Sequence, residues 1–476
     1  MKTRSFIYLF LLNLFLIHCQ SAERNQISEK PNFLFIAVDD LRPELNCYGA
    51  EWIHSPHIDR LASTGIRFDF AYCQVPVCGA SRASLLTGLR PSSTRFLTYD
   101  TWAEKDAPGI TSLPKYLKDH GYTTISNGKV FHNLNDSKIS WSENPWHPIQ
   151  DQGGDINWRD YQTLENRQIA KEHDGLGPAF ELIEGDDSLY FDGKIAKKSL
   201  FDLERLKKAG QPFFLAVGFL KPHLPFNAPA KYWEIYNPEE IRMPENPDPP
   251  EKAPDASLHN WGELRQYFNI PKEGPLPDSV ARKLIQGYYA CVSYTDVQIG
   301  KLLKKLEELK LDENTVVVLW GDHGWNLGEH GLWCKHCNYE TSLRAPLILK
   351  VPWLYGNIKS KALVEFIDIY PTLCKLANLD IPDHVLGESL LPYFENPSHP
   401  GKSLVYSRFH RGESIKNQKY RYTEWLDDSK NRYADMLYDH EIDIQENKNI
   451  ADIAELIPVI EGFRKSNREL REKLIE

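Results

Sequence analysis

The sequence predicts an α/β fold: a doubly wound, mostly parallel sheet followed by a smaller C-terminal α+β subdomain built on a short antiparallel sheet. Residues 32–38 form a continuous apolar run, which is typical of a strand buried on both faces of a parallel sheet. Similar runs then alternate with helical patterns, and this alternation predicts parallel strands joined by helical crossovers. Near the C-terminus short strands follow one another without helices, which indicates the second, antiparallel part.

The predicted elements follow the first strand in a regular order. A helix over 57–64 ends at Gly65, and a second over 113–120 ends at Gly121, because glycine readily terminates a helix. The remaining expected strands are 123–126, 212–219, 315–320 and 346–351, and the remaining expected helices are 191–209, 278–309 and 369–378. In such sheets ligands bind beyond the carboxyl ends of the strands, so the segments that follow the strands form the candidate site.

Two irregular segments divide the chain. The Pro-rich stretch 243–254 begins an insertion that runs to 277, and we expect it to form a lid or rim over the site. The segment 380–402 has the Pro/Gly/polar composition of a linker. We therefore place a catalytic domain at 23–395 and a C-terminal subdomain at 396–476. In that subdomain the expected elements are strands over 403–409, 419–425 and 435–439 and a helix from about 453.

The composition limits the classes of function. The chain has 476 residues, 41% of them hydrophobic, which is enough for one large domain with a sizeable core and a smaller one. Its formal net charge of −10 argues against a nucleic-acid partner. A polyanionic substrate is compatible with that charge, because a site can be locally basic inside an acidic protein.

The first 22 residues have the pattern of an export signal. Lys2 and Arg4 form a basic start, and 6–17 is an apolar run too short for a stable membrane anchor. The sequence Leu-Ile-His-Cys at 16–19 resembles a bacterial lipobox with Cys19 as the lipidation point, and ordinary cleavage near Ala22 is the alternative. We therefore expect an exported protein: a periplasmic or outer-membrane lipoprotein with a lipid anchor, or an extracellular protein.

Six of the eight cysteines remain once Cys19 and the cysteine of the motif described below are set aside. Export permits disulfides, but a chain of this size does not require them. Cys334 and Cys337 have no second Cys pair at zinc-ribbon or zinc-finger spacing, which argues against a zinc site. A local disulfide between them, or two free thiols that flank Lys335, are the alternatives.

Acidic residues follow two of the predicted buried strands. Asp39 and Asp40 come directly after 32–38, and Asp322 and His323 follow 315–320. Two strand ends of one sheet can bring these side chains together, and three converging carboxylates repel one another unless a cation neutralises them. An oxygen-rich site suits Ca²⁺ or Mg²⁺, with His323 the least usual ligand. The alternative for each Asp alone is an ordinary loop cap.

Basic side chains also follow predicted strands. Lysine and histidine that converge with a dication form a pocket for a tetrahedral anion. Each of them alone is more often a solvated loop residue, so the prediction depends on their shared position at the ligand-binding edge. The residues are Lys129 and His132 after 123–126, Lys221 and His223 after 212–219, and Lys335 shortly after Asp322.

The most informative segment is Cys78-Gly79-Ala80-Ser81-Arg82, which continues to Leu86-Thr87-Gly88. It predicts a cysteine at the start of a short helix, where unpaired N–H groups and a partial positive charge favour an anion. A thiol in this position is expected to be acidic and reactive. The alternative is a half-buried cysteine before an ordinary surface helix.

This segment resembles the signature of the type I sulfatase family, Cys-x-Pro/Ala-Ser-Arg followed by Leu-Thr-Gly, and the chain is similar to the iduronate-2-sulfatase subgroup of that family. The resemblance implies an alkaline-phosphatase-like fold and a sulfuric ester hydrolase that acts on a sulfated carbohydrate, either a glycosaminoglycan or an algal polysaccharide. It also implies one Ca²⁺ per chain and a maturase that oxidises Cys78 to formylglycine. The other matching segments are 35–43, 128–132, 212–226, 321–331 and 437–439, together with parts of the 243–277 insertion.

The resemblance also implies a role for each matching residue. The hydrated formylglycine made from Cys78 would be the nucleophile and a metal ligand, and turnover would pass through a sulfo-enzyme intermediate. Arg82 and Lys129 would stabilise the hydrate, and His132 would hydrogen-bond it and help the intermediate to collapse. The Ca²⁺ ligands would be Asp39, Asp40, Cys78, Asp322 and His323, and His223 and Lys335 would grip the sulfate and assist the leaving alkoxide.

Three positions bear on how closely the chain follows the family pattern and on its substrate. Ala80 stands where many sulfatases have proline, which bears on how efficiently the cysteine is oxidised. His323 replaces the asparagine of many sulfatases and fits the iduronate-type subgroup. Trp325 is either a sugar-stacking platform at the rim of the pocket or a packed core residue.

Two other functions are compatible with the sequence. A phosphodiesterase or phosphonate monoester hydrolase can share the fold and the Cys-x-x-Ser-Arg element, and it would favour phosphate esters over sulfate esters. A catalytically silent glycan-binding lipoprotein would keep the pocket and leave Cys78 unoxidised.

Overall fold

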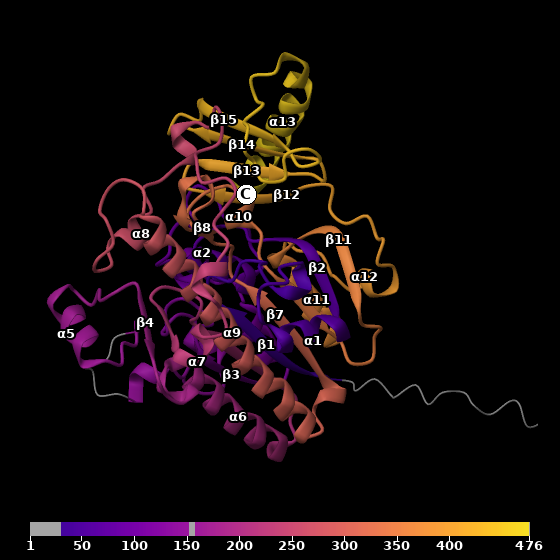
Figure 1. Cartoon of the computed structure of the whole chain (residues 1–476). Coiled ribbons are helices and arrows are strands. Elements are labelled where there is room, and N and C mark those ends of the chain that lie inside the picture. Colours follow the sequence, from indigo (N-terminus) through magenta and orange to yellow (C-terminus); the bar gives the residue numbers. More distant parts are fainter. Residues whose placement is uncertain (1–29, 152–157, 476) are drawn as a thin grey trace, which may run out of the picture.

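The computed structural model describes residues 30–151 and 158–475 and contains the predicted α/β fold (Figure 1). The predicted export signal, with Cys19, lies outside the described residues. Within them, no helix is both long and apolar enough to cross a membrane. The centre is a seven-stranded sheet with the order β11-β2-β10-β7-β1-β5-β3. Its strands are β1 (Asn32–Val38), β2 (Ile66–Tyr72), β3 (Thr123–Gly128), β5 (Phe213–Phe219), β7 (Thr315–Gly321), β10 (Leu347–Lys350) and β11 (Ile358–Glu365).

The sheet is mostly parallel, as predicted. β1 pairs in parallel with β5 and with β7, β3 extends this parallel part beyond β5, and β11 is parallel to β2. β10 differs, because it runs antiparallel to both of its neighbours, β2 and β7. Strands β2 and β11 were not predicted. Half-buried or exposed positions interrupt their buried ones, unlike the continuous buried run of β1.

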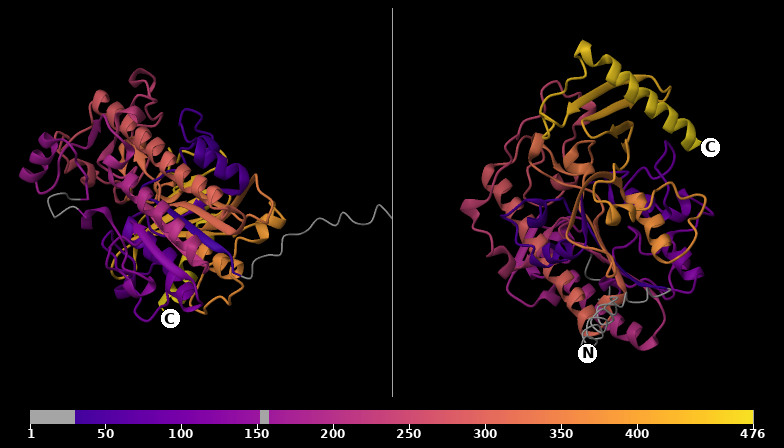
Figure 2. Two further views of the ribbon diagram at one scale, coloured as in Figure 1. Left: turned by 90° about the horizontal axis from the view of Figure 1, so that it is seen from below. Right: turned by 90° about the vertical axis from the view of Figure 1, so that its right-hand side faces the viewer.

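Two hydrophobic cores cover the two faces of the sheet. Because successive residues of a strand point to opposite faces, Leu34 and Ile36 of β1 belong to one core and Phe33 and Phe35 to the other. The right-hand view in Figure 2 shows the resulting layers of helices, sheet and helices. Helices α1 (Pro56–Thr64), α6 (Phe191–Ala209) and α9 (Asp278–Glu308) contribute to the first core, and α2 (Cys78–Thr87), α4 (Leu113–Asp119) and α11 (Ile369–Leu376) to the second.

Shorter elements decorate this framework. The structure describes every residue of the Pro-rich insertion 243–277. Its regular structure is limited to a short 3-10 turn and one four-residue helix, α8. The remaining helices are α3 (Ala103–Asp106), α5 (Leu164–Glu172), α7 (Ala230–Trp233), α8 (Gly262–Arg265), α10 (Glu340–Leu343) and α12 (Pro392–Glu395), and the short strands are β4 (Phe180–Ile183), β6 (Phe226–Pro229), β8 (Asn326–Leu327) and β9 (Trp333–Cys334).

The C-terminal part is a four-stranded antiparallel sheet covered by a helix, at the top of Figure 1. Ile415 and Tyr422 of the sheet pack with Ile460 and Phe463 of the helix in a third core. The sequence predicted three of the four strands and the helix, and missed β13. The elements are β12 (Val405–Phe409), β13 (Gly412–Lys416), β14 (Tyr420–Leu426), β15 (Arg432–Asp439) and α13 (Ile457–Ile475).

The segment predicted as a linker, 380–402, packs against the central sheet. The Lys402 ammonium lies 2.7 Å from a carboxylate oxygen of Glu365, at the end of β11, and 2.7 Å from one of Asp368. Val385 lies beside Gly88, at the end of α2. The two parts of the chain are therefore connected by a packed segment.

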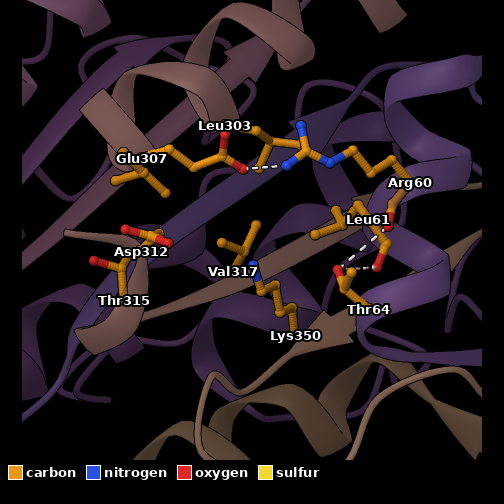
Figure 3. A pocket seen from close by; sticks show the side chains of 10 residues that line it. Arg60, Leu61, Thr64, Leu303, Glu307, Asp312, Thr315, Val317 and Lys350 are labelled. Carbon is orange, nitrogen blue, oxygen red and sulfur yellow. Dashed lines mark hydrogen bonds and ion pairs between the residues drawn. The ribbon is translucent and has the colours of Figure 1, made fainter. Parts of the chain in front are cut away.

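A pocket at the start of β7 is separate from the carboxyl edge of the sheet (Figure 3). Its lining includes Thr315, the first residue of β7, whereas Asp322 follows the last. A strand of seven residues spans about 20 Å, so this pocket lies at the end of the sheet opposite to the predicted site. The lining residues are Arg60, Leu61, Thr64, Leu303, Leu306, Glu307, Asp312, Thr315, Val317 and Lys350.

Candidate active site

The carboxyl ends of β1 and β7 bring the predicted acidic residues together. The backbone N–H of Asp322 donates to the carbonyl of Val38, and the N–H of Asp40 donates to Oδ1 of Asp322 over 2.9 Å. The side chains of Asp39, Asp40 and Asp322 are each at most 1% exposed, as is His323. The structure therefore concentrates three buried carboxylates and one imidazole at the edge where the sequence places them.

Asp40 has an unusual backbone conformation. Its φ of 61° lies in the left-handed region, which costs free energy for a residue with a side chain. The Tyr288 hydroxyl donates to the Asp40 carbonyl over 2.8 Å and helps to hold this conformation. Such strain is common at functional sites, where the surrounding structure stabilises it.

Cys78 is the first residue of α2 and lies beside the acidic cluster. Its Sγ is 3.3 Å from Nε2 of His323 and 3.8 Å from Oδ1 of Asp40. The next residue must be glycine, because a Cβ on Gly79 would lie 2.0 Å from the carbonyl oxygen of Tyr99. The Ser81 hydroxyl donates to the Asp322 carbonyl over 2.5 Å, which joins α2 to the end of β7.

The expectation of an acidic thiol is wrong. Burial raises the pKa of Cys78 to about 11, and the negative charge of Asp39 adds to this effect, although Lys129 and Lys335 oppose it. The partial positive charge of the helix start does not compensate for an environment that is buried and rich in carboxylates. Before any oxidation, the side chain of Cys78 is therefore a neutral thiol.

Arg82 links the helix to both strand ends. Its Nε donates to Oδ2 of Asp322 over 2.8 Å and its Nη2 donates to Oδ1 of Asp39 over 3.0 Å. Lys129 donates to the other oxygen of Asp39 over 2.5 Å. Burial opposes the charged form of Asp39, but Lys129 and Arg82 outweigh it and hold the pKa of Asp39 well below its usual range.

A second group of charges surrounds Asp40. The Lys335 ammonium donates to both oxygens of Asp40 over 3.1 Å and to Oε1 of Glu263 over 2.9 Å. Nε2 of His223 lies 3.1 Å from the same oxygen of Glu263 and 3.7 Å from Asp40. Glu263, which lies on α8 in the Pro-rich insertion, was not among the predicted site residues. The only sequence signal that pointed towards Glu263 was the expectation that this insertion forms a lid or rim over the site.

His223 is held at both ring nitrogens. Nδ1 lies 2.6 Å from the carbonyl oxygen of Leu224, and Nε2 faces Glu263, so both nitrogens have oxygen acceptors. Burial and the positive charge of Lys335 disfavour the charged ring, but the charge of Asp40 and the hydrogen bonds to Cys78 and Glu263 outweigh them and raise the pKa of His223 to about 9. These contacts fit an imidazolium ion, which can give a proton to a leaving group.

His132 differs from His223 in charge. Burial, with a contribution from the positive charge of Lys129, lowers the pKa of His132 to about 2, so the ring is neutral. Its Nδ1 is buried and has no hydrogen-bond partner among the described residues. The ring packs edge-on against Tyr99, with 6.1 Å between ring centres. A neutral imidazole with a free nitrogen can accept a hydrogen bond.

Lys221 has different surroundings from those predicted, and the surroundings of Trp325 distinguish between its two alternatives. The Lys221 ammonium donates to the carbonyls of His223 and Pro225, so it supports the backbone of that loop and does not contribute to an anion pocket. Trp325 is 1% exposed, and the Lys335 ammonium lies 4.9 Å from the centre of its ring. The packing alternative for Trp325 therefore fits the structure better than the sugar-stacking alternative.

The donor set fits a hard divalent cation. One group of possible ligand atoms, all within 4.8 Å of one another, comes from Asp39, Asp40, Cys78 and His223. A second such group comes from Cys78, Asp322 and His323. Burial raises the pKa of Asp40, and the positive charges of His223 and Lys335 offset only part of this effect. A dication bound by these oxygens would favour the charged carboxylate of Asp40, which burial alone disfavours.

Cys334 and Cys337 are both buried and are not bonded to each other. The Cys337 sulfur lies 3.0 Å from the Ser342 hydroxyl, and Asn326 donates to it over 3.6 Å. The sequence left open a local disulfide or two free thiols, and the structure contains the two free thiols. Lys335 between them reaches Asp40, so the segment serves to present this lysine.

Comparison with known proteins agrees with this site. A model of the sulfatase family matches residues 31–379, and a model of the N-sulphoglucosamine sulphohydrolase C-terminal region matches residues 328–473. The chain is 35% identical to the iduronate 2-sulfatase of Mus musculus over 422 residues, which are 80% of this chain and 74% of that protein. It is 33% identical to the iduronate 2-sulfatase of Homo sapiens over 452 residues, which are 82% of this chain and 80% of that protein.

The fold has close counterparts among solved structures. One, a complex with its substrate D-glucosamine-2-N,6-O-disulfate, superposes with a TM-score of 0.74 over 94% of this chain and 98% of that chain, at 23% identity. This likeness concerns the fold, and it confirms the predicted alkaline-phosphatase-like architecture. The family model covers most of the chain, and the relatives named above exceed 30% identity. The chain therefore belongs to the sulfatase family and is a sulfuric ester hydrolase.

Proposed function

We propose that this enzyme is an exported, calcium-dependent sulfatase that hydrolyses a sulfate ester of a sulfated carbohydrate through a formylglycine made from Cys78. One observation carries the proposal. The Cys78 side chain lies at the start of α2, in contact with His323 and Asp40, inside a buried cluster of carboxylates and cations. A helix start surrounded by lysine, arginine and histidine favours a tetrahedral anion at this position.

The residues around Cys78 support this chemistry. Ca²⁺ held by Asp39, Asp40, Asp322, His323 and the side chain at position 78 would polarise the sulfate oxygens. The hydrate of a formylglycine at position 78 would supply the attacking hydroxyl. Arg82 orients Asp39 and Asp322, since it donates to both. His132 is neutral, and its Nδ1 has no hydrogen-bond partner among the described residues, so it can accept a hydrogen bond from the second hydroxyl.

Two donors are available for the sulfate and the leaving oxygen. A sulfate ester places negative charge on its equatorial oxygens and, as the bond breaks, on the departing alkoxide. Lys335 and His223 lie together on one side of Asp40, so both N–H groups can serve these oxygens. The His223 imidazolium is the proton donor, because the pKa of His223 is raised to about 9.

The substrate we propose is a polymer or oligomer that contains 2-O-sulfated uronate, as in a glycosaminoglycan or an algal polysaccharide. The similarity to two iduronate 2-sulfatases supports this choice. The test is release of inorganic sulfate from oligosaccharides that carry 2-O-sulfated iduronate. Release that falls to background in Cys78→Ala supports the proposal. Faster hydrolysis of phosphonate or phosphate esters than of any sulfate ester would contradict it, and it would favour the phosphonate hydrolase alternative.

Maturation and export complete the proposal. We infer that a formylglycine-generating maturase accepts the Ala80 form of the motif, and that the N-terminal segment directs the protein out of the cytoplasm. The basic start, the apolar run and Cys19 support export with a lipid anchor. Fractionation of the producing cells tests this: the wild type is expected in the membrane fraction and Cys19→Ala in the soluble exported fraction. Recovery of both in the cytoplasm would exclude export.

A further inference from the structure

Glu263 lies beside two groups that the proposed reaction uses, although it comes from a different part of the fold. We propose that Glu263 is a positioning residue, which holds the imidazole of His223 and the ammonium of Lys335 in the orientation from which they reach the leaving oxygen. This inference rests on the proposed sulfatase function. It assigns the Pro-rich insertion a role in catalysis through this one carboxylate.

The geometry of Glu263 suits this role. One oxygen, Oε1, accepts from Lys335 Nζ over 2.9 Å and lies 3.1 Å from His223 Nε2. A single acceptor shared by two donors fixes the position of each relative to the other. The ring of His223 is held on its other side by the Leu224 carbonyl, so Glu263 sets the remaining direction. Without Glu263, the Lys335 ammonium would be drawn towards Asp40 alone.

The insertion holds Glu263 firmly, although α8 has only four residues. The guanidinium of Arg265 donates to the backbone carbonyls of Asn260, Pro271 and Gly274 over 2.6 to 2.8 Å, and so closes the loop on both sides of α8. The same guanidinium stacks on the ring of Trp261, 3.5 Å from its centre. The side chain of Glu263 is 20% exposed, whereas its second oxygen, Oε2, is buried and lies 3.9 Å from Nε2 of His336.

This arrangement makes a prediction about the leaving group. A sugar alkoxide is a poor leaving group and needs a donor at the departing oxygen, whereas an aryl oxide leaves with much less help. Loss of orientation at His223 and Lys335 must therefore slow hydrolysis of a sugar sulfate more than that of an aryl sulfate. Misplacement of a reacting group by about 1 Å can cost about 100-fold in rate.

The experiment compares Glu263→Gln with the wild type on two substrates, a 2-O-sulfated iduronate disaccharide and 4-nitrophenyl sulfate. Both proteins are full-length and produced with the maturase. The expected result is a fall in kcat of about 100-fold on the sugar sulfate. On the aryl sulfate we expect kcat to fall by less than about 3-fold, and we expect little change of KM on either ester. The ratio of the two rates does not depend on the fraction of folded protein, so the test holds even if the variant is less stable.

Controls separate this inference from the proposed function. Asp255→Asn makes the same carboxylate-to-amide change at an exposed position of the same insertion and is expected to behave as the wild type. If the wild type is active and Glu263→Gln loses the same factor in rate on both esters, or loses none, the role proposed for Glu263 is wrong. The proposed function is then unaffected. A wild type that contains formylglycine and releases no sulfate from either ester would overturn the proposed function, and this inference with it.

Discussion

Nε of Arg82 donates to Oδ2 of Asp322 over 2.8 Å, although one residue lies on α2 and the other follows β7, and both side chains are fully buried. The same guanidinium also donates to Asp39, which follows β1. The helix that carries Cys78 is thus joined to two neighbouring strand ends by one side chain. We infer that this link defines the geometry of the site.

The first prediction concerns this link. Arg82→Met leaves the buried carboxylates of Asp39 and Asp322 without their shared partner, and we expect it to lower the free energy of unfolding by about 3–5 kcal/mol. Arg60→Met is the matched control, because Arg60 forms an exposed ion pair with Glu307 and its loss should cost less than about 1 kcal/mol. Urea unfolding measures both. A loss for Arg82→Met no larger than that of the control would contradict the account.

The second prediction concerns the metal. Removal of Ca²⁺ with a chelator should lower the thermal unfolding midpoint, because buried carboxylates then lose their counterion. Calcium at about 100 times its Kd should restore about 2.7 kcal/mol of stability. Asp40→Asn should reduce this calcium-dependent shift, and Asp255→Asn, at an exposed position, should leave it unchanged. A wild type whose midpoint does not respond to chelator or calcium would exclude the site.

The acidic cluster illustrates what the sequence could predict. Asp39, Asp40, Asp322 and His323 follow β1 and β7, two continuous apolar runs that are easy to recognise as buried neighbouring strands. Once both strands are placed in one parallel sheet, their carboxyl ends must meet. The position of Cys78 followed from the helix pattern after it. These residues could be placed because short-range patterns determine where each strand or helix ends.

Other features depend on contacts that no local pattern encodes. Glu263 reaches the site from an irregular insertion whose path is set by the Arg265 hydrogen bonds to distant carbonyls. The direction of β10 is decided by its neighbours, since an apolar run has the same pattern in either direction. The expected acidity of Cys78 failed because burial and the Asp39 carboxylate, both tertiary effects, outweigh the helix start.

A third prediction concerns pH. Burial opposes the charged form of Glu365, but Arg90 and Lys402 outweigh it and hold the pKa of this carboxyl below its ordinary value of 4.5. The stability that these ion pairs contribute is therefore complete above pH 4.5 and is lost as the pH falls through the lowered pKa.

The test compares wild type with Glu365→Gln by urea unfolding at pH 7 and at progressively lower pH. The variant should be less stable at pH 7, and the difference should narrow below pH 4.5 as the wild-type carboxylate becomes protonated. Groups that titrate in both proteins cancel in this difference. If the difference in stability between wild type and Glu365→Gln does not change with pH, the charge of Glu365 does not stabilise the packing of 380–402 against the sheet.

The fourth prediction concerns Cys334 and Cys337, which are buried free thiols. Dithiothreitol should leave the unfolding midpoint unchanged, because no bond between them is present to reduce. A thiol reagent should label both cysteines in denatured protein and leave them unlabelled in native protein, since burial protects them. A drop in the midpoint on reduction would instead show a stabilising disulfide.

The measurement that tests the central claim most directly is mass spectrometry of the tryptic peptide that ends at Arg82 and contains Cys78, from protein purified from its own host. We predict the mass loss that corresponds to conversion of the –CH₂SH side chain into –CHO, together with its hydrate. The same preparation should release sulfate from a 2-O-sulfated iduronate substrate. An unmodified thiol at Cys78 throughout an active preparation would contradict the formylglycine mechanism.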